Sequence, residues 1–165
     1  MCEDTGIVEK ALKVAERCHR DQKDKAGMPY IEHPKRVSAR CVTEEEKAVA
    51  LLHDTMEDCG MTSECLRAFG FGEEIIEAVV SVTRRKHEDY FDFVRRAGRN
   101  RIGRVVKMHD LEDNLDMMRF VSQCPLVPDA RESMVRDGSL RVLGEKDLYR
   151  MNKYLAAYRL LQSFE

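Results

Sequence analysis

The side chains best suited to chemistry in this sequence are a small set of histidines and carboxylates. His53 and Asp54 are adjacent and directly follow an apolar run at residues 50–52, and Glu57 and Asp58 each come four residues later. Polar groups placed behind a core-facing run need partners, because burying them unsatisfied is costly. The spacing would put each pair on one face of a single helix. Imidazole and carboxylate are suitable ligands for a divalent transition metal.

Two further residues are candidates to complete such a metal site from other parts of the chain. His33 stands directly before Pro34, and Asp110 lies in the acidic stretch VKMHDLEDN. The adjacent His53 and Asp54 can surround one ion only if other helices contribute the remaining ligands. We therefore expect His33 and Asp110 to lie beside them in the fold.

Each feature taken alone also has an ordinary structural explanation. A lone histidine at a helix start, such as His33, is often a surface or capping residue. The string HDTMED is compatible with a helix that ends in a solvated acidic turn. The acidic residues around Asp110 are compatible with an exposed helix face. The metal site is favoured by the joint occurrence of these features, with their order and spacing.

Composition indicates a globular protein with no strong attraction to polyanions. The 165 residues are 43% hydrophobic and 35% charged, which is typical of a single folded domain over residues 1–165. The 28 basic and 30 acidic side chains leave a net charge of -2, so we expect neither nucleic acid nor a membrane as partner. The start of the chain does not resemble a signal peptide. We expect a cytoplasmic protein whose six cysteines are reduced, mostly buried thiols.

Helical periodicity and capping signals predict an all-α fold, with no period-two strand pattern. The predicted helices cover about residues 5–19, 34–41, 43–57, 62–70, 73–85, 90–98 and 100–110, and a last one begins near residue 145. Thr43 and Glu46 form a capping-box pair, and Thr62 and Asn100 are further candidates for N-caps. The residues of the last helix that we expect to face inward are Leu148, Met151, Leu155, Tyr158 and Leu161.

The order of these motifs resembles the HD phosphohydrolases of the RelA/SpoT type, in particular the small stand-alone alarmone hydrolases. In that family a segment HxxQxRKxGxPYIxHPxxV comes first, and residues 19–37 here read HRDQKDKAGMPYIEHPKRV. VALLHDTMED follows at residues 49–58, and VKMHDLEDNL at residues 106–115 resembles VKLADRLHNM. The resemblance covers about residues 8–118 and implies a compact HD-domain helical bundle.

The resemblance also implies an activity: metal-dependent hydrolysis of guanosine 3′,5′-bis(diphosphate), ppGpp, or a related alarmone, with release of pyrophosphate from the 3′ position. The partner would then be a small-molecule nucleotide, and a homo-oligomer is compatible with the sequence. The roles that the family assigns are a single Mn²⁺ held by His33, His53, Asp54 and Asp110, catalysis by Glu57 and Asp58, and substrate binding by Lys25, Tyr30 and Asn114.

The sequence departs from the family pattern at three positions. The arginine before the family's lysine is Asp24 here, and the arginine and histidine of the last motif are Leu111 and Asp113. We interpret these changes as a loss of positive or hydrogen-bonding groups near a polyphosphate. The metal, Lys25 and cations such as Arg84 or Lys107 remain to offset that loss.

Two other functions stay open from the sequence. One is a general HD nucleotide phosphatase or nucleotidase, including one that removes the 2′-phosphate of NADPH, and a substrate panel would identify it. The other is a nucleotide-binding module without turnover. A broken ligand set would favour that module, whereas all four ligands and both acidic residues are present here.

Overall fold

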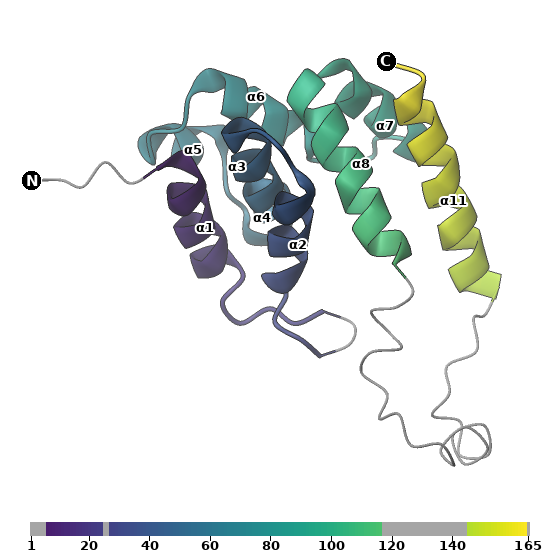
Figure 1. Ribbon diagram of the computed structural model, residues 1–165, viewed down its shortest axis with the longest axis horizontal. Helices are drawn as coiled ribbons and strands as arrows, with labels where there is room; N and C mark the ends of the chain where they lie inside the picture. Colours follow the sequence, from purple (N-terminus) through teal and green to yellow (C-terminus); the bar gives the residue numbers. More distant parts are fainter. Residues whose placement is uncertain (1–5, 25–26, 117–144, 165) are drawn as a thin grey trace, which may run out of the picture.

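The computed structural model describes residues 6–24, 27–116 and 145–164 (Figure 1). Within this part of the chain every regular element is an α-helix, beside one isolated β-bridge between Lys23 and Pro29. The predicted all-α class is therefore confirmed. The helices are α1 (Ile7–Cys18), α2 (Glu32–Arg40), α3 (Glu44–Leu52), α4 (Thr55–Cys59), α5 (Ser63–Ala68), α6 (Glu73–Val82), α7 (Tyr90–Arg99), α8 (Arg101–Leu115) and α11 (Glu145–Gln162).

Helix α8 packs against five other helices of the bundle, and α3 packs against four. α3 packs against α1, α2, α6 and α8, while α8 packs against α2, α3, α6, α7 and α11 (Figure 1). The larger core cluster surrounds α3, and a smaller one joins α7, α8 and α11 through Phe93, Leu111 and Leu161. His53 at the end of α3 and Asp110 on α8 are thus held by elements that are packed on several sides.

Several predicted helix ends are confirmed, because their capping groups make the expected bonds. Thr43 and Glu46 form a complete capping box at the start of α3. The Thr62 side chain accepts a hydrogen bond from Cys65 N at α5, and the Asn100 side chain accepts one from the third residue of α8. These side chains satisfy N–H groups that a helix start otherwise leaves without a partner.

The single helix predicted over residues 43–57 is wrong, because the structure divides it into α3 and α4. His53 and Asp54 form the turn between the two helices. The Thr55 hydroxyl donates to Leu52 O at 2.7 Å, so a side chain takes a carbonyl that a continuous helix would have used. The residues on either side of this turn consequently do not share the face of one helix.

Two other helices differ from the prediction. α6 ends at Val82 instead of residue 85, and the Thr83 hydroxyl donates to Val79 O at 2.8 Å just beyond its end. α2 begins at Glu32, two residues before the proline expected in its first turn. The expected N-cap of the first helix, Thr5, lies outside the described residues. Both ends of the predicted domain, residues 1 and 165, also lie outside them, so the assignment of residues 1–165 to a single domain stays a prediction.

The inward face of α11 was predicted only in part. Leu161 is buried and Met151 and Tyr158 are half-buried, whereas Leu148 and Leu155 are 49% and 48% exposed. α11 approaches its neighbours through the fully buried Ala157, and this small residue sets which face of the helix meets α7 and α8.

The expectation of mostly buried cysteines is wrong for the described part of the chain. Cys18, Cys41, Cys59 and Cys65 are free thiols, and of these Cys41 alone is buried. No helix among the described residues is long and apolar enough to cross a membrane.

We predict that Gly103→Ala destabilises the fold, because α8 approaches α6 closely at this glycine. A Cβ at residue 103 would lie 2.0 Å from Ser81 Oγ and 3.3 Å from Val82 Cγ1. Overpacking of this kind costs about 1–3 kcal/mol in the free energy of unfolding, measurable by urea denaturation. Ser81→Ala should by itself have a smaller effect, and the double variant should recover part of the loss. An unchanged stability of Gly103→Ala would contradict the close α6–α8 packing.

Candidate metal centre

Residues from three separate helical segments converge at one buried point. The nearest ligand atoms of His33, His53 and Asp54 all lie within 4.8 Å of one another. Asp110 joins them from α8, with Oδ1 3.2 Å from His33 Nε2 and 3.8 Å from His53 Nε2. His33, His53 and Asp110 are between 3% and 6% exposed. The four residues that the sequence analysis singled out are thus neighbours in the structure.

The orientation of the His53 ring suits it to bind a metal. Its Nδ1 lies 2.7 Å from Ala50 O, so Nδ1 carries the proton and donates to that carbonyl. In the neutral ring that a metal requires, Nε2 is therefore the nitrogen with the free lone pair. This atom is buried without a hydrogen-bond partner in the described part of the chain, although it lies 3.0 Å from Asp54 Oδ2. A buried nitrogen in this state is satisfied by a cation.

His33 is oriented in the same way by a carboxylate instead of a carbonyl. Its Nδ1 lies 2.7 Å from Asp113 Oδ2, which leaves Nε2 directed at Asp110. Asp113 has no exposed surface, and the Arg36 guanidinium binds both of its oxygens at 2.9 and 3.1 Å. Although burial opposes ionisation, His33 and Arg36 hold the pKa of Asp113 well below its usual range.

Asp110 is held by two side chains on its own helix. Lys107 Nζ donates to Oδ2 at 2.7 Å, and Asn114 Nδ2 donates to Oδ1 at 2.7 Å. Burial would lower the pKa of Lys107, but the Asp110 carboxylate raises it above its ordinary value. The positive charge of Lys107 is therefore already paired with Asp110 inside the site. This corrects the expectation that Lys107 remains available to bind a phosphate.

The remaining carboxylate, Asp54, faces Tyr30. The Tyr30 hydroxyl donates to Asp54 Oδ2 at 2.5 Å. Burial alone would raise the pKa of Asp54, but the neighbouring His53 brings it down to about 2. Of the three expected substrate residues, Tyr30 and Asn114 therefore lie beside ligand carboxylates, while Lys25 lies outside the described residues.

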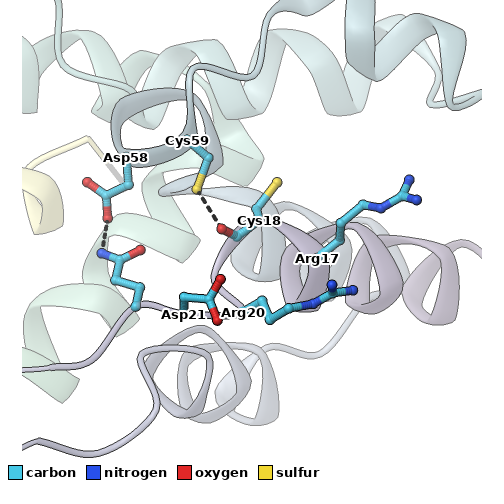
Figure 2. Close-up of a pocket in the computed structure, with 7 residues that line it drawn as sticks. Arg17, Cys18, Arg20, Asp21, Asp58 and Cys59 are labelled. Carbon is cyan, nitrogen blue, oxygen red and sulfur yellow. Dashed lines mark hydrogen bonds between the residues drawn. The ribbon is translucent and has the colours of Figure 1, made fainter.

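Glu57 and Asp58 extend from α4 on different sides of the cluster. Glu57 accepts a hydrogen bond from Arg84 N, and burial together with nearby Asp54 raises the pKa of Glu57 above its ordinary value. Asp58 accepts a hydrogen bond from Gln22 at 2.9 Å and lines a pocket of about 660 Å³ with Cys59 (Figure 2).

The interpretation of Leu111 and Asp113 as groups facing a phosphate is wrong. Leu111 is 1% exposed and belongs to the core cluster shared by α7, α8 and α11. Asp113 is buried against His33 and Arg36, as described above. Sequence reasoning did not identify this contact, which joins residues 80 positions apart. The sequence offered one signal for this contact: Asp113 departs from the family pattern, and the basic Arg36 stands three residues after His33.

The donor set is one that divalent metals use in proteins. Two neutral imidazoles and two carboxylates supply nitrogen and oxygen ligands, and each imidazole is oriented through its other nitrogen. The described residues contain no other group of three or more candidate ligands with this spacing. The residues present therefore fit a single divalent ion.

Comparison with known proteins agrees with this geometry. The HD domain family matches residues 11–121. A probable GTP pyrophosphokinase of Mycobacterium leprae is 32% identical over 142 residues, which is 78% of this chain and 18% of that protein. The guanosine-3′,5′-bis(diphosphate) 3′-pyrophosphohydrolase MESH1 of Danio rerio is 37% identical over 91 residues, which is 50% of this chain and 49% of that protein. The chain thus spans about half or less of these relatives.

A solved structure shares the fold at low sequence identity. It is described as a metazoan ortholog of SpoT that hydrolyzes ppGpp and plays a role in starvation responses, and it matches with a TM-score of 0.63 and 21% identity over 99% of this chain and 88% of that one. Because the family match spans more than half of the sequence and includes all four convergent residues, this chain belongs to the HD domain family and is a relative of the SpoT/RelA-type proteins.

Proposed function

We propose that this chain is a metal-dependent phosphohydrolase that releases pyrophosphate from the 3′ position of guanosine 3′,5′-bis(diphosphate) in the cytoplasm. The observation that carries the proposal is the buried convergence of His33, His53, Asp54 and Asp110, with two further carboxylates beside it. Relatives such as the guanosine-3′,5′-bis(diphosphate) 3′-pyrophosphohydrolase MESH1 of Danio rerio support the choice of substrate.

In this proposal His33, His53, Asp54 and Asp110 hold one divalent ion, for which we propose Mn²⁺. A divalent ion in such a site binds phosphate oxygens and lowers the pKa of water. The Tyr30 hydroxyl and Asn114 restrain the two proposed ligand carboxylates, and we propose that both also contact the substrate. Lys25 is the third proposed substrate residue.

Glu57 and Asp58 are proposed to orient the attacking water and to move its proton. Neither carboxylate is needed to complete the four-residue donor set. The raised pKa of Glu57 suits a group that accepts a proton during the reaction and gives it up afterwards. Its bond to Arg84 N fixes one carboxylate oxygen, which leaves the other available for water.

Asp113 is proposed to position His33 for metal binding. A carboxylate that accepts the Nδ1 proton fixes the tautomer and the ring plane, and it raises the basicity of Nε2. Arg36 keeps the buried carboxylate ionised. The backbone carbonyl of Ala50 does the same for His53 without a charge.

We predict that hydrolysis needs both the metal and its ligands. Chelated protein should release no pyrophosphate from the bis(diphosphate), and Mn²⁺ should restore the activity. His53→Ala and Asp54→Ala should lose bound metal, measured by elemental analysis, together with activity. The substrates compared are the guanosine and adenosine alarmones, NADPH and nucleoside triphosphates. Cleavage of another phosphoester but of neither alarmone would replace this proposal with the general phosphatase.

We predict that Glu57→Gln and Asp58→Asn separate catalysis from binding. Because neither side chain is part of the donor set, both variants should keep the metal content of the wild type. The turnover number should fall by roughly 10²-fold, the usual scale for a general acid–base group. Steady-state kinetics beside metal analysis provide the test. Normal turnover in both variants would make these residues only a solvated helix end.

We predict that Asp113→Ala weakens metal binding by about 10–100-fold, the range found when a ligand's orienting partner is lost. Asp113→Asn, which still accepts the His33 proton, should lose less. The measurement is competition with a fluorescent chelator on the folded protein. Glu112→Ala is the matched control, because Glu112 is a neighbouring carboxylate that bonds to His109 and Tyr158 instead. Equal metal affinity of Asp113→Ala and Glu112→Ala would refute the positioning role.

A further inference from the structure

The metal centre itself is a poor environment for a substrate with two phosphate arms. Four carboxylates, Asp54, Glu57, Asp58 and Asp110, stand in or beside it. Lys107 is the nearest cation, and its ammonium is bonded to Asp110. A bound divalent ion offsets this charge for one arm only, so a second phosphate arm requires cations outside the centre.

A pocket beside Glu57 supplies such cations. It has a volume of about 550 Å³ and lies between α4 and the segment that joins α6 to α7. Arg84, Arg85 and Lys86 line it, and Glu57 is its one carboxylate. All three basic side chains are exposed, and within the described residues Arg85 and Lys86 make no ion pair. The pocket therefore carries a net positive charge next to an acidic centre.

The segment that carries these cations is held by several hydrogen bonds from one half-buried arginine. Arg96 of α7 donates to the carbonyls of Val80, Ser81 and Thr83 at 2.8, 3.1 and 2.8 Å. It also binds both carboxylate oxygens of Glu88, each at 2.8 Å. The negative charge of Glu88 is thereby compensated by Arg96.

Glu88 in turn shapes the chain at the pocket. Its carboxylate accepts from Arg85 N at 2.9 Å, and its carbonyl accepts from the Arg84 guanidinium at 2.7 Å. Arg84 N bonds to Glu57, so the same segment contacts the proposed catalytic carboxylate. Because the backbone of this segment is already held, binding an anion would order only the side chains of the exposed cations.

The pocket beside Asp58 is a weaker candidate for the same role. It also contains two arginines, but Asp21 and Asp58 balance their charge. Figure 2 shows that the side chains of Arg17 and Arg20 extend away from Asp58. A phosphate group in that pocket would face as many carboxylates as cations.

From this charge and position we infer that the pocket lined by Arg84, Arg85 and Lys86 binds the second phosphate arm of the substrate, the 5′-diphosphate of a nucleotide whose 3′ arm is at the metal centre. The inference rests on the proposed function and extends it to substrate selection. Arg85 and Lys86 supply the charge, and Arg84 joins the pocket to Glu57. The chain would thus select a nucleotide that is phosphorylated at both positions.

The test compares Arg85→Ala/Lys86→Ala with the wild type on two probes. One is guanosine 3′,5′-bis(diphosphate), and the other is guanosine 3′-diphosphate with a free 5′ hydroxyl. Lys13→Ala/Arg99→Ala is the matched control, since it removes two exposed basic side chains from α1 and from the far end of α7. KM and kcat are measured with Mn²⁺, and the affinity for each probe is measured by calorimetry on chelator-stripped protein.

The variant should raise KM for the doubly phosphorylated probe about tenfold with little change in kcat, the lower end of what charged hydrogen bonds contribute once salt screens them. KM for the 5′-hydroxyl probe should be unchanged, and the control variant should match the wild type on both. The inference would be overturned if the variant raised KM equally for the two probes. It would also be overturned if the wild type bound both probes with equal affinity. Wild-type protein that binds the two probes differently but cleaves neither would overturn the proposed function alone.

Discussion

The packing of α3 against α8 is the constraint on which the rest of the structure depends. Both helices pack against several others (Figure 1). His53 and Asp54 follow the end of α3, Asp110 lies on α8, and α2, which carries His33, packs against both helices. His53 leaves the last turn of α3, and Asp110 meets it from α8 at 3.8 Å. Gly103 permits the approach of α8 to α6, so the position of Asp110 depends on a glycine two turns away.

The division between α3 and α4 falls at the two adjacent candidate ligands. His53 and Asp54 both keep right-handed helical backbone angles in this turn. Their side chains bring His53 Nε2 and Asp54 Oδ2 to 3.0 Å, a separation that suits a shared ion. The turn also places Glu57 and Asp58 on a separate short helix, where each has its own hydrogen-bond partner. The bond from Thr55 to Leu52 O is therefore part of how the site is assembled.

The proximity of His33, His53, Asp54 and Asp110 could be predicted from sequence, because these residues have distinctive types and appear in a family order. Helix starts at Thr43, Thr62 and Asn100 were predictable for a local reason, since a cap and its partner lie within three residues. The inward face of α11 was less predictable, because the buried Ala157 sets how the helix approaches its neighbours.

The contacts that tune the site could not be predicted in this way. Asp113 was interpreted as an obstacle to a polyphosphate, yet in the fold it orients His33, 80 residues earlier in the chain. Local pattern contains no information on a pairing of that length. The role of Arg96, which pairs with Glu88, was unpredictable for a similar reason. Arg96 also donates to three backbone carbonyls, and only the folded chain brings these carbonyls to it.

The two sides of α4 carry side chains of opposite charge. Carboxylates dominate where a divalent ion is expected, and each is paired: Asp110 with Lys107, Asp113 with Arg36, and Asp54 with Tyr30. Cations dominate beyond Glu57, where Arg85 and Lys86 are exposed. The net charge of -2, which sums 28 basic and 30 acidic side chains over the whole chain, does not show this separation. A ligand with a metal-binding phosphate arm and a second anionic arm would match both regions at once, whereas a ligand with one arm would leave the basic pocket unused.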